Sequence, residues 1–328
     1  MNNILLARPC FVLLILLAIS EISTGSTGRR PIYYGDGVDA TNENGQTRLY
    51  MAAGMGLREI MIPFLEQGAD VNFRDKTGKT PLHALALMGL PEGAELLLKY
   101  GANVNARDNE LNTPLHIACV HSYSEGLKKA EIFLSHGADI GARNKYGDTP
   151  LHVAFYKAWS DTEQNRKVVE MLLSNGAVVN TWDDDGWGSL AQWVHVYSSG
   201  PIERFMEAKH VKLEKGPTIN TYILKESLTD KPSMRLMPLH IASLMAVNEQ
   251  VELLLDNGAD VNASSVEMML TPLHFAAVAG REDVLELLLN HGAMVNARDK
   301  DGDTPLGLAI RCNQSKAAAV LRNHGGTE

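Results

Sequence analysis

The chain is poor in cysteine, with three among 328 residues. Cys10 stands before an N-terminal apolar run, and Cys119 and Cys312 lie in distant copies of the repeat described below. This usage excludes a disulfide framework of the kind that holds small secreted domains together, and no bond between Cys119 and Cys312 is expected. The folded part must therefore be stabilised by packing.

Runs of like charge are absent as well, since no five consecutive residues carry the same sign. The net charge is −9, which disfavours nucleic acid as a partner because such binding needs a basic stripe. Hydrophobic residues make up 45% of the chain, which argues against a disordered protein. The length suits one or two ordinary domains or one repeat array.

Motifs of catalysis and cofactor binding are missing too. The sequence has no Walker A run, no His-Glu-x-x-His, no paired Cys-x-x-Cys and no Gly-x-Ser-x-Gly. Gly54 and Gly56 supply part of a dinucleotide-binding pattern, but they follow a predicted helix rather than a strand. We therefore predict no enzyme activity, no cofactor and no metal site.

The N-terminus differs from the rest of the chain. Arg8 is followed by an apolar run over residues 11–19 and then by polar residues. The run is shorter than the roughly 20 residues that span a bilayer, and Ala18 and Ser20 suit a cleavage site. We predict a signal peptide over residues 1–20, with an uncleaved membrane anchor as the alternative. The protein is then secreted, periplasmic or membrane-anchored; it is cytosolic if this segment is not a signal.

A strong internal repeat fills most of the remaining sequence. Thr47, Thr80 and Thr113 are spaced by 33 residues, and so are Thr271 and Thr304. Thr-Pro-Leu-His occurs at 80–83, 113–116, 149–152 and 271–274, with Met-Pro-Leu-His at 237–240. Gly-Ala recurs at 68, 101, 137, 176, 258 and 292, and Val-Asn follows it in most copies. Such a period predicts stacked supersecondary units, none of which can bury its apolar faces alone.

One unit shows how the sequence sets its structure. Thr80 is a good N-cap, and Pro81 suits the first helical position, where no N–H is needed. A short apolar helix breaks at residues 89–91, and a second helix ends at Gly101, a residue suited to a left-handed C-terminal cap. Asp-Lys-Thr-Gly at residues 75–78 predicts a turn between units. Each unit is therefore a helix, a turn, a second helix and an extended finger.

This pattern resembles the ankyrin repeat. The resemblance rests on Thr-Pro-Leu-His, on Gly-Ala after a Leu-Leu pair and on Val-Asn before the turn, and it covers residues 44–326. It implies an all-α fold, a solenoid of about eight helix-turn-helix units with β-turn fingers. The Thr-equivalent positions of the eight units are Thr47, Thr80, Thr113, Thr149, Gly188, Met237, Thr271 and Thr304. The end units have Tyr50 and Gly307 in place of histidine, as expected where one face meets water.

The fifth unit is predicted to be degenerate and to carry an insertion. From Gly188 to Met237 is 49 residues, and no Gly-Ala closes its second helix. The extra sequence alternates apolar and polar residues about Gly216, which indicates a hairpin. Such an irregular segment is either functional or drift within a degenerate repeat. The predicted segments are a flexible leader at 21–43, units one to four at 44–186, the degenerate unit at 187–236 and units six to eight at 237–326.

The histidines of the repeated motif are predicted to be architectural. Metal ligands must converge on one point, whereas one histidine per stacked unit forms a row. The ankyrin resemblance implies that each imidazole ties a helix start to the neighbouring finger. The predicted structural residues are Thr80, His83, Thr113, His116, Thr149, His152, His240, Thr271 and His274. A second class, His136, His291 and His324, precedes the glycine after the second helix, where it either suits the helix dipole or is plain surface.

All four tryptophans fall between residues 159 and 193. Tryptophan is favoured at protein interfaces, but these side chains could equally fill irregular packing at the broken unit. Filling is favoured for Trp193, and partner contact is favoured for Trp187 at a finger tip.

The leading hypothesis is a monomeric, non-enzymatic scaffold that binds a protein partner through the concave ankyrin surface and its finger tips. It meets a membrane only through an uncleaved N-terminal segment. The predicted partner-binding residues are Lys76, Lys79, Asn109, Glu110, Lys145, Tyr146, Asp148, Asp184, Asp185, Trp187, Lys300, Asp301 and Asp303. The alternative is an array carrying a small ligand-binding or catalytic insert at 195–236, with His195, His210, Glu214 and Glu226 as candidates. Two sequons, at Asn262 and Asn313, matter only in a eukaryotic secretory pathway, and Asn262 is expected to bond within its turn instead.

Overall fold

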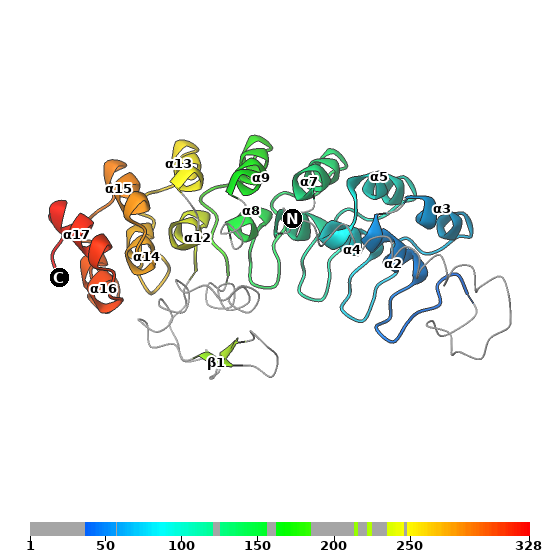
Figure 1. The fold of residues 1–328 in the computed structure, drawn as a ribbon, viewed down its shortest axis with the longest axis horizontal. Coiled ribbons are helices and arrows are strands. Elements are labelled where there is room, and N and C mark those ends of the chain that lie inside the picture. Colours follow the sequence, from blue (N-terminus) through cyan, green and yellow to red (C-terminus); the bar gives the residue numbers. More distant parts are fainter. Residues whose placement is uncertain are drawn as a thin grey trace, which may run out of the picture.

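The computed structural model describes residues 37–56, 58–120, 125–155, 162–184, 213–215, 222–224, 235–245 and 248–328. Its helices form pairs that stack into a curved row (Figure 1). The first or inner helices are α2 (Arg48–Met55), α4 (Pro81–Met88), α6 (Pro114–Val120), α8 (Pro150–Ala154), α12 (Pro238–Met245), α14 (Pro272–Ala279) and α16 (Pro305–Arg311). The second or outer helices are α3 (Arg58–Glu66), α5 (Pro91–Lys99), α7 (Gly126–Ser135), α9 (Thr162–Ser174), α13 (Asn248–Asp256), α15 (Glu282–Asn290) and α17 (Ser315–Asn323). The predicted all-α solenoid is confirmed.

The helix boundaries follow from the residues that stand there. Thr80 is extended, with φ −95° and ψ 168°, and Pro81 opens α4. The proline fits because the first amide of a helix has no intrahelical partner. At the end of the unit, Gly101 lies in the left-handed region with φ 88°, a conformation that a side chain would strain. The predicted start and stop signals thus act where the sequence places them.

The apolar side chains of successive pairs form one continuous core. Inner helices pack on inner helices and outer helices on outer helices, so that α6 contacts α4 and α8 while α7 contacts α5 and α9. In α4, Leu82, Ala84 and Leu85 are buried, whereas α5 buries Leu96 and Leu97 and exposes its other face. Stability is therefore shared along the row, as in other solenoids.

The units on either side of the predicted fifth unit contact each other directly. Helix α12 packs on α8, and α13 packs on α9, so no pair of described helices stands between them. The described stack contains seven pairs rather than eight. Asn180, which follows α9, donates from Nδ2 to the carbonyl of Gly258, which follows α13, at 2.9 Å. The fourth unit and the unit that begins at Met237 are direct neighbours.

The finger after α9 shows where the extra sequence enters. In the finger after α3, the N–H of Asp75 donates to the carbonyl of Lys79, and the N–H of Lys79 donates to Asp75 Oδ1, both at 2.9 Å. Asp183 and Leu236 form the same pair of bonds, at 2.8 and 2.7 Å. Residues 184–235 therefore take the place in the chain of an ordinary finger tip. The long spacing therefore begins and ends within one finger.

The insertion contains one described pair of strands. β1 (Leu213–Lys215) pairs with β2 (Tyr222–Leu224) in antiparallel register, with Glu214 opposite Ile223. The predicted hairpin is confirmed at these residues. Glu214 is the one candidate of the ligand-binding alternative that the structure describes; His195, His210 and Glu226 lie outside the described residues.

The predicted signal peptide and most of the predicted leader also lie outside the described residues. Among the helices that are described, none combines the length and the hydropathy that a membrane crossing requires. Cys119 in α6 and Cys312 after α16 are both free thiols, and burial raises the pKa of Cys119.

One lysine is buried between two units. Lys129 on α7 is fully buried, and its Nζ donates to the carbonyls of Leu85, Ala86 and Gly89 at 3.4, 2.8 and 3.3 Å. Burial lowers the pKa of Lys129 to about 8. The ammonium supplies donors to the last carbonyls of α4, which have no partner within the helix. This contact ties the second unit to the third.

Candidate functional site

In five of the inner helices, one histidine joins the helix to the finger that follows. In His83, Nδ1 accepts from the N–H of Thr80 at 3.1 Å, and Nε2–H donates to the carbonyl of Asn112 at 3.0 Å. Asn112 directly precedes the next inner helix start. The other four Nε2 atoms lie 3.0 Å from Asp148 O (His116), 3.3 Å from Leu236 O (His152), 3.1 Å from Leu270 O (His240) and 3.1 Å from Asp303 O (His274). The bond of His152 joins two residues that lie on either side of the insertion in the sequence.

Burial favours the uncharged ring in four of these histidines, His83, His116, His152 and His240. Burial lowers the pKa of His116, His152 and His240 to about 4, and it lowers the pKa of His83 as well. Because Nε2 donates and Nδ1 accepts, a second proton would place two donors face to face at Nδ1. With both nitrogens engaged, the ring has no atom left for a metal or for proton exchange with a substrate.

The two end units replace the histidine and cap the helix directly. Thr47 Oγ1 accepts from the N–H of Tyr50, and Thr304 Oγ1 accepts from the N–H of Gly307, both at 3.1 Å. Burial and the carboxylate of Asp75 raise the pKa of Tyr50, whose hydroxyl bonds to that carboxylate. Tyr50 thus still connects α2 to the next finger.

Four fingers, which we call the regular fingers, are turns organised by one buried Asp or Asn side chain: Asp75, Asp108, Asn144 or Asp299. Asp75 Oδ1 accepts from the N–H groups of Thr77 and Lys79, at 2.8 and 2.9 Å. Burial alone would raise the pKa of Asp75, but these bonds outweigh it and hold the pKa below its usual value. Asp108, Asn144 and Asp299 make the same two bonds in their own fingers. These side chains are therefore used in hydrogen bonds inside their own turns.

Neighbouring finger tips are joined by backbone hydrogen bonds. The N–H of Lys76 donates to Asn44, that of Asn109 to Thr77, and that of Lys145 to Glu110, at 3.1, 3.0 and 2.9 Å. The row continues from Asp184 to Tyr146 at 2.8 Å and, at the far end, from Lys300 to Met268 at 3.0 Å. The tips from Asn44 to Asp184 therefore form one supported surface, and the last two fingers are joined in the same way.

The predicted contact residues are distributed unevenly over this surface. The exposed ones are Lys76, Asn109, Lys145, Asp184, Lys300 and Asp301, and the half-buried ones are Lys79, Glu110, Tyr146 and Asp303. Asp185 and Trp187 lie outside the described residues. Asp148 is fully buried, so its prediction as a contact residue is wrong. Its N–H and one carboxylate oxygen bond to Asn144, and its carbonyl accepts from His116.

Several tip side chains pair with one another. Lys145 Nζ lies 3.2 Å from Glu110 and 5.8 Å from the centre of the Tyr146 ring. The Tyr146 hydroxyl donates to Glu110 at 3.5 Å. These three residues, from two adjacent fingers, form an aromatic and charged cluster at the middle of the described row.

The sequence analysis missed a set of arginines at the base of the fingers. Arg74, Arg107 and Arg143 each directly precede the Asp or Asn that organises a finger. Each guanidinium donates to a backbone carbonyl of the next finger: Arg74 to Arg107, Arg107 to Arg143 at 3.4 Å, and Arg143 to Trp182 at 2.6 Å. The recurrence of Arg before Asp or Asn, again at Arg298, is visible in the sequence and could have been used.

Trp182 has a packing role at the same junction. It is the one tryptophan among the described residues; Trp159, Trp187 and Trp193 lie outside them. The centre of its ring lies 5.9 Å from that of His240, whose other side meets Phe275 edge-on at 5.6 Å. Trp182 thus fills the boundary between the fourth unit and the next.

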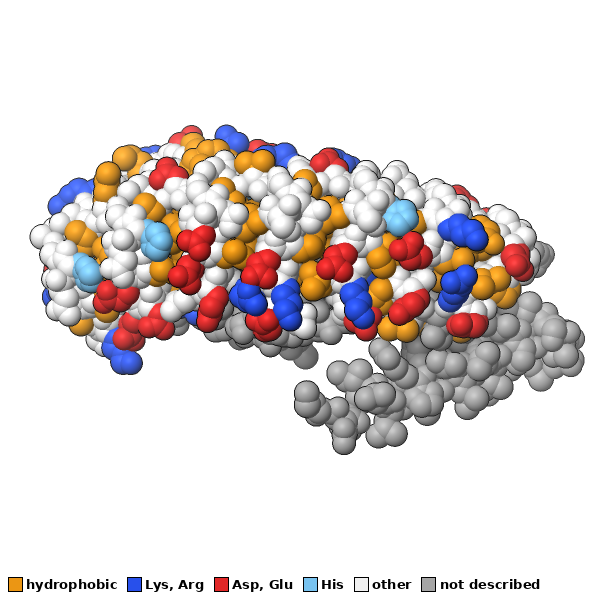
Figure 2. All heavy atoms as spheres, turned by 90° about the horizontal axis from the view of Figure 1, so that it is seen from above, with side chains coloured by type: hydrophobic (Ala, Val, Ile, Leu, Met, Phe, Trp, Pro, Cys, Tyr) orange, Lys and Arg blue, Asp and Glu red, His pale blue; other side chains and the backbone are white. Residues whose placement is uncertain are grey.

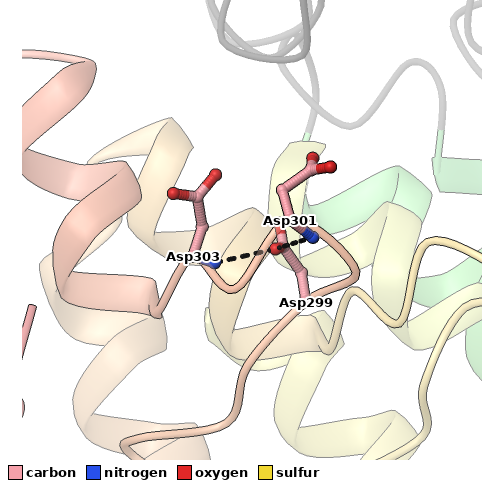
Figure 3. A group of neighbouring side chains, drawn as sticks. All are labelled: Asp299, Asp301 and Asp303. Carbon is pink, nitrogen blue, oxygen red and sulfur yellow. Dashed lines mark hydrogen bonds between the residues drawn. The ribbon is translucent and has the colours of Figure 1, made fainter.

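Three aspartates cluster in the last finger, after α15 (Figure 3). Their carboxylate oxygens lie within 4.8 Å of one another. Asp299 Oδ1 accepts from the N–H groups of Asp301 and Asp303, both at 2.9 Å, which is the bonding of every regular finger. Asp303 pairs with Arg311 on α16 at 2.8 Å. Finger geometry and an ion pair explain this cluster.

A ladder of asparagines links the turns after the outer helices. Asn72 Nδ2 donates to the carbonyl of Gly101 at 3.0 Å, and its Oδ1 accepts from the N–H of Asn103 at 2.8 Å. Asn105, Asn180, Asn262 and Asn296 make equivalent bonds. Asn262 uses both ends of its amide in bonds to the next unit, to Gly292 and Met294, so the predicted bonding within its own turn is wrong.

The outer-helix surface carries charges of both signs. Figure 2 views this side and shows acidic, basic and histidine side chains interspersed among apolar ones. His136, His291 and His324 are the C-terminal caps of α7, α15 and α17. His136 lies 3.5 Å from Glu95, and His324 lies 2.9 Å from Glu286. These pairs connect adjacent outer helices at the surface.

The comparisons with known families agree with this architecture. Models described as ankyrin repeats match residues 25–108 and 239–328 in three-copy form, residues 96–154 in many-copy form and residues 146–184 as a single repeat. The chain belongs to the ankyrin repeat family. The matches stop at residue 184 and resume at 239, which agrees with an insertion into one ankyrin finger. No curated protein matches the sequence.

Solved ankyrin repeat domains share the fold. The ankyrin repeat domain of human ASB11 superposes with a TM-score of 0.62 at 22% identity, over 86% of this chain and all of that one. The ankyrin repeat domain of Bcl-3, a member of the IkappaB protein family, gives 0.55 at 24% identity, over 85% of this chain and all of that one. At these identities the likeness concerns the fold alone. An ankyrin repeat domain is a general protein–protein interaction fold, and its relatives are typically non-catalytic scaffolds.

Proposed function

We propose that this ankyrin protein is a non-enzymatic scaffold that binds a protein partner along its row of finger tips. The observation that supports this most is the backbone bonding from tip to tip, which holds exposed side chains of successive units on one surface. A surface held in place before binding loses less entropy when a partner docks. The inner helices beside the fingers complete the concave side of the array.

The chemistry of the described side chains favours binding over catalysis. The five buried histidines are the residues most suited to proton transfer, and both nitrogens of each ring are engaged in hydrogen bonds between units. The finger carboxylates are likewise used by amides of their own turns. These groups build the scaffold.

A strained apolar residue at one tip also favours binding. Leu111 stands where the other regular fingers have Gly78, Gly147 and Gly302, and it adopts φ 59° with 40% of its surface exposed. A left-handed leucine costs about 1–2 kcal/mol relative to the right-handed region, and solvent exposure offsets none of it. Contact with a partner would bury this apolar side chain. The free energy gained by removing it from water would offset the cost of the left-handed backbone.

Replacing both Tyr146 and Trp187 by alanine should weaken partner capture while the fold persists. An aromatic hot spot at an interface is worth about 2 kcal/mol, so capture should fall roughly 30-fold if one of the two residues is a hot spot and roughly 1,000-fold if both are. The measurement is quantitative cross-linking and pull-down with the full chain from secreted or envelope fractions, with circular dichroism to verify folding.

Tyr100→Ala is the matched control, because Tyr100 is an exposed aromatic residue that caps the outer helix α5, away from the finger tips. Capture should be unchanged in this variant. Equal capture by the Tyr146/Trp187 variant and the parent protein would show that the finger row is not the binding site.

We further propose that the protein enters a secretory pathway through residues 1–20. The basis is the short apolar run after Arg8, followed by small residues. Mass spectrometry of the native protein's N-terminus tests this, and a mature chain starting near residue 21 is the expected result. An intact Met1–Ser20 on a protein in the cytosol would contradict it.

A further inference from the structure

The basic residues of the first three regular fingers form one row. Arg74, Arg107 and Arg143 repeat at the same position of successive units, and each guanidinium reaches the backbone of the next finger. Lys76 and Lys145 occupy the adjoining tip positions and are exposed, as are Arg74 and Arg107. We call these five residues the basic row. The inter-unit bonds hold its guanidinium groups in line with the long axis of the stack.

The acidic residues of the same fingers are turned inward. Asp75, Asp108 and Asp148 are 8%, 3% and 0% exposed, respectively, because their side chains bond within the finger turns. Glu110 is the remaining acid of residues 74–79, 107–112 and 143–148, and it is half-buried beside Lys145. These fingers therefore present mainly positive charge, although the whole chain carries −9.

The last finger has mixed charge, because Lys300 and Asp301 are both exposed at its tip. Arg298 occupies the position of Arg74, but its guanidinium donates to the carbonyl of Gly302 in its own finger at 2.7 Å. The basic row is thus a local feature of one half of the array rather than a consequence of the repeat.

We propose that the basic row binds an extended, acidic peptide segment of the partner. Guanidinium groups present paired donors that match a carboxylate, and one such group per unit suits side chains spaced along an extended strand. Glu110 and Asp184 stand beside the row, and they disfavour the continuous phosphate backbone of a nucleic acid. This inference rests on the proposed binding function and adds the chemistry of the ligand.

The test is fluorescence anisotropy of a labelled peptide of alternating glutamate and serine, titrated with the purified full chain at low ionic strength. The double variant Arg74→Gln/Arg107→Gln should bind about tenfold more weakly, since two exposed ion pairs contribute up to about 0.7 kcal/mol each. The single variant Arg298→Gln is the matched control, with the same residue type and finger position, and should bind like the parent chain.

A second variant distinguishes a loss of peptide binding from a loss of folding in the first variant. Lys76→Gln removes a charge from an exposed tip without touching the arginine bonds between fingers, and it should weaken the peptide about twofold to threefold. Equal affinity of the parent and both variants would overturn the proposal. So would a single-stranded oligonucleotide that binds as tightly as the peptide, because the site would then select phosphate.

The outcome separates this inference from the proposed function. If the Tyr146/Trp187 variant loses protein capture but the acidic peptide fails to bind the parent chain, the finger row binds proteins and the acidic ligand is wrong. If the peptide binds through Arg74 and Arg107 while that variant captures its partner normally, the ligand chemistry stands and the placement of the partner at Tyr146 and Trp187 is wrong.

Discussion

Acidification from pH 6.5 to pH 4 should unfold the ankyrin stack. His116, His152 and His240 have pKa values of about 4 in the folded protein, because burial opposes their charged form. In the unfolded chain the same rings titrate near pH 6.5. Above pH 6.5 both states are neutral and the difference has no effect. Below pH 6.5 the unfolded chain binds protons that the buried rings of the folded stack do not bind. The free energy of unfolding therefore falls as the pH drops.

The expected loss is large compared with the stability of an ordinary domain. A shift of one pKa unit corresponds to about 1.4 kcal/mol, so each of the three histidines contributes about 3 kcal/mol by pH 4. The sum, about 9 kcal/mol, lies within the 5–15 kcal/mol by which a typical domain is stable. His83 changes in the same direction, since burial also lowers its pKa.

Urea unfolding followed by circular dichroism at several pH values measures this effect. His116→Gln should be less stable than the parent chain at pH 7, yet it should lose about one third less stability between pH 7 and pH 4. A free energy of unfolding that stays constant over this range would show that the buried rings accept protons without disturbing the stack.

His152→Ala should divide the array into two unfolding blocks. The His152 ring is the histidine link between residues on either side of the insertion, with Nδ1 accepting from Thr149 at 3.2 Å and Nε2 donating to Leu236 at 3.3 Å. Its removal leaves a buried amide without its acceptor and opens a cavity, which together destabilise by about 3 kcal/mol. The interface between α8 and α12 then no longer couples the two halves, and nearest-neighbour coupling governs how a repeat array unfolds.

His274→Ala is the matched control for that prediction. His274 makes the same bonds to Thr271 and Asp303, but it lies within an uninterrupted run of units. The control should lower stability by a similar amount while the main transition stays single. Differential scanning calorimetry distinguishes the two results, and a single transition for His152→Ala would mean that other contacts hold the halves together.

Much of the fold was predictable because the same helix start and stop signals recur in successive repeats. Thr-Pro starts the inner helices and Gly-Ala ends the outer ones, and each signal acts through short-range backbone geometry. The inter-unit role of the five histidines followed from the ankyrin resemblance, since a single unit gives no sign of its neighbour. The period indicated that the Asn262 side chain makes hydrogen bonds, but not that these bonds run to the next unit.

The insertion and the site were harder to predict because they depend on contacts between distant residues. Gly188-Ser-Leu-Ala fell in phase with the repeat, and only the pairing of Asp183 with Leu236 shows that the finger closes around the extra sequence. Asp148 looked like a tip residue by its spacing. It is buried because the residue before each inner helix bonds inward to the finger turn, a direction that spacing does not encode. The arginines at positions 74, 107 and 143 were visible in the sequence, but their alignment required the stacking geometry.

Excision of residues 185–234 provides the most direct test of a continuous ankyrin stack with the extra segment inserted into one finger. The variant joins Asp184 to Arg235 through a short glycine-containing turn, which resembles residues 76–78 in the finger after α3. Urea unfolding should keep one cooperative transition, and circular dichroism should retain the helical signal of the described pairs. Two separate transitions, or loss of the cooperative one, would show that the excised residues form a unit of the stack and would contradict direct packing of α8 and α9 on α12 and α13.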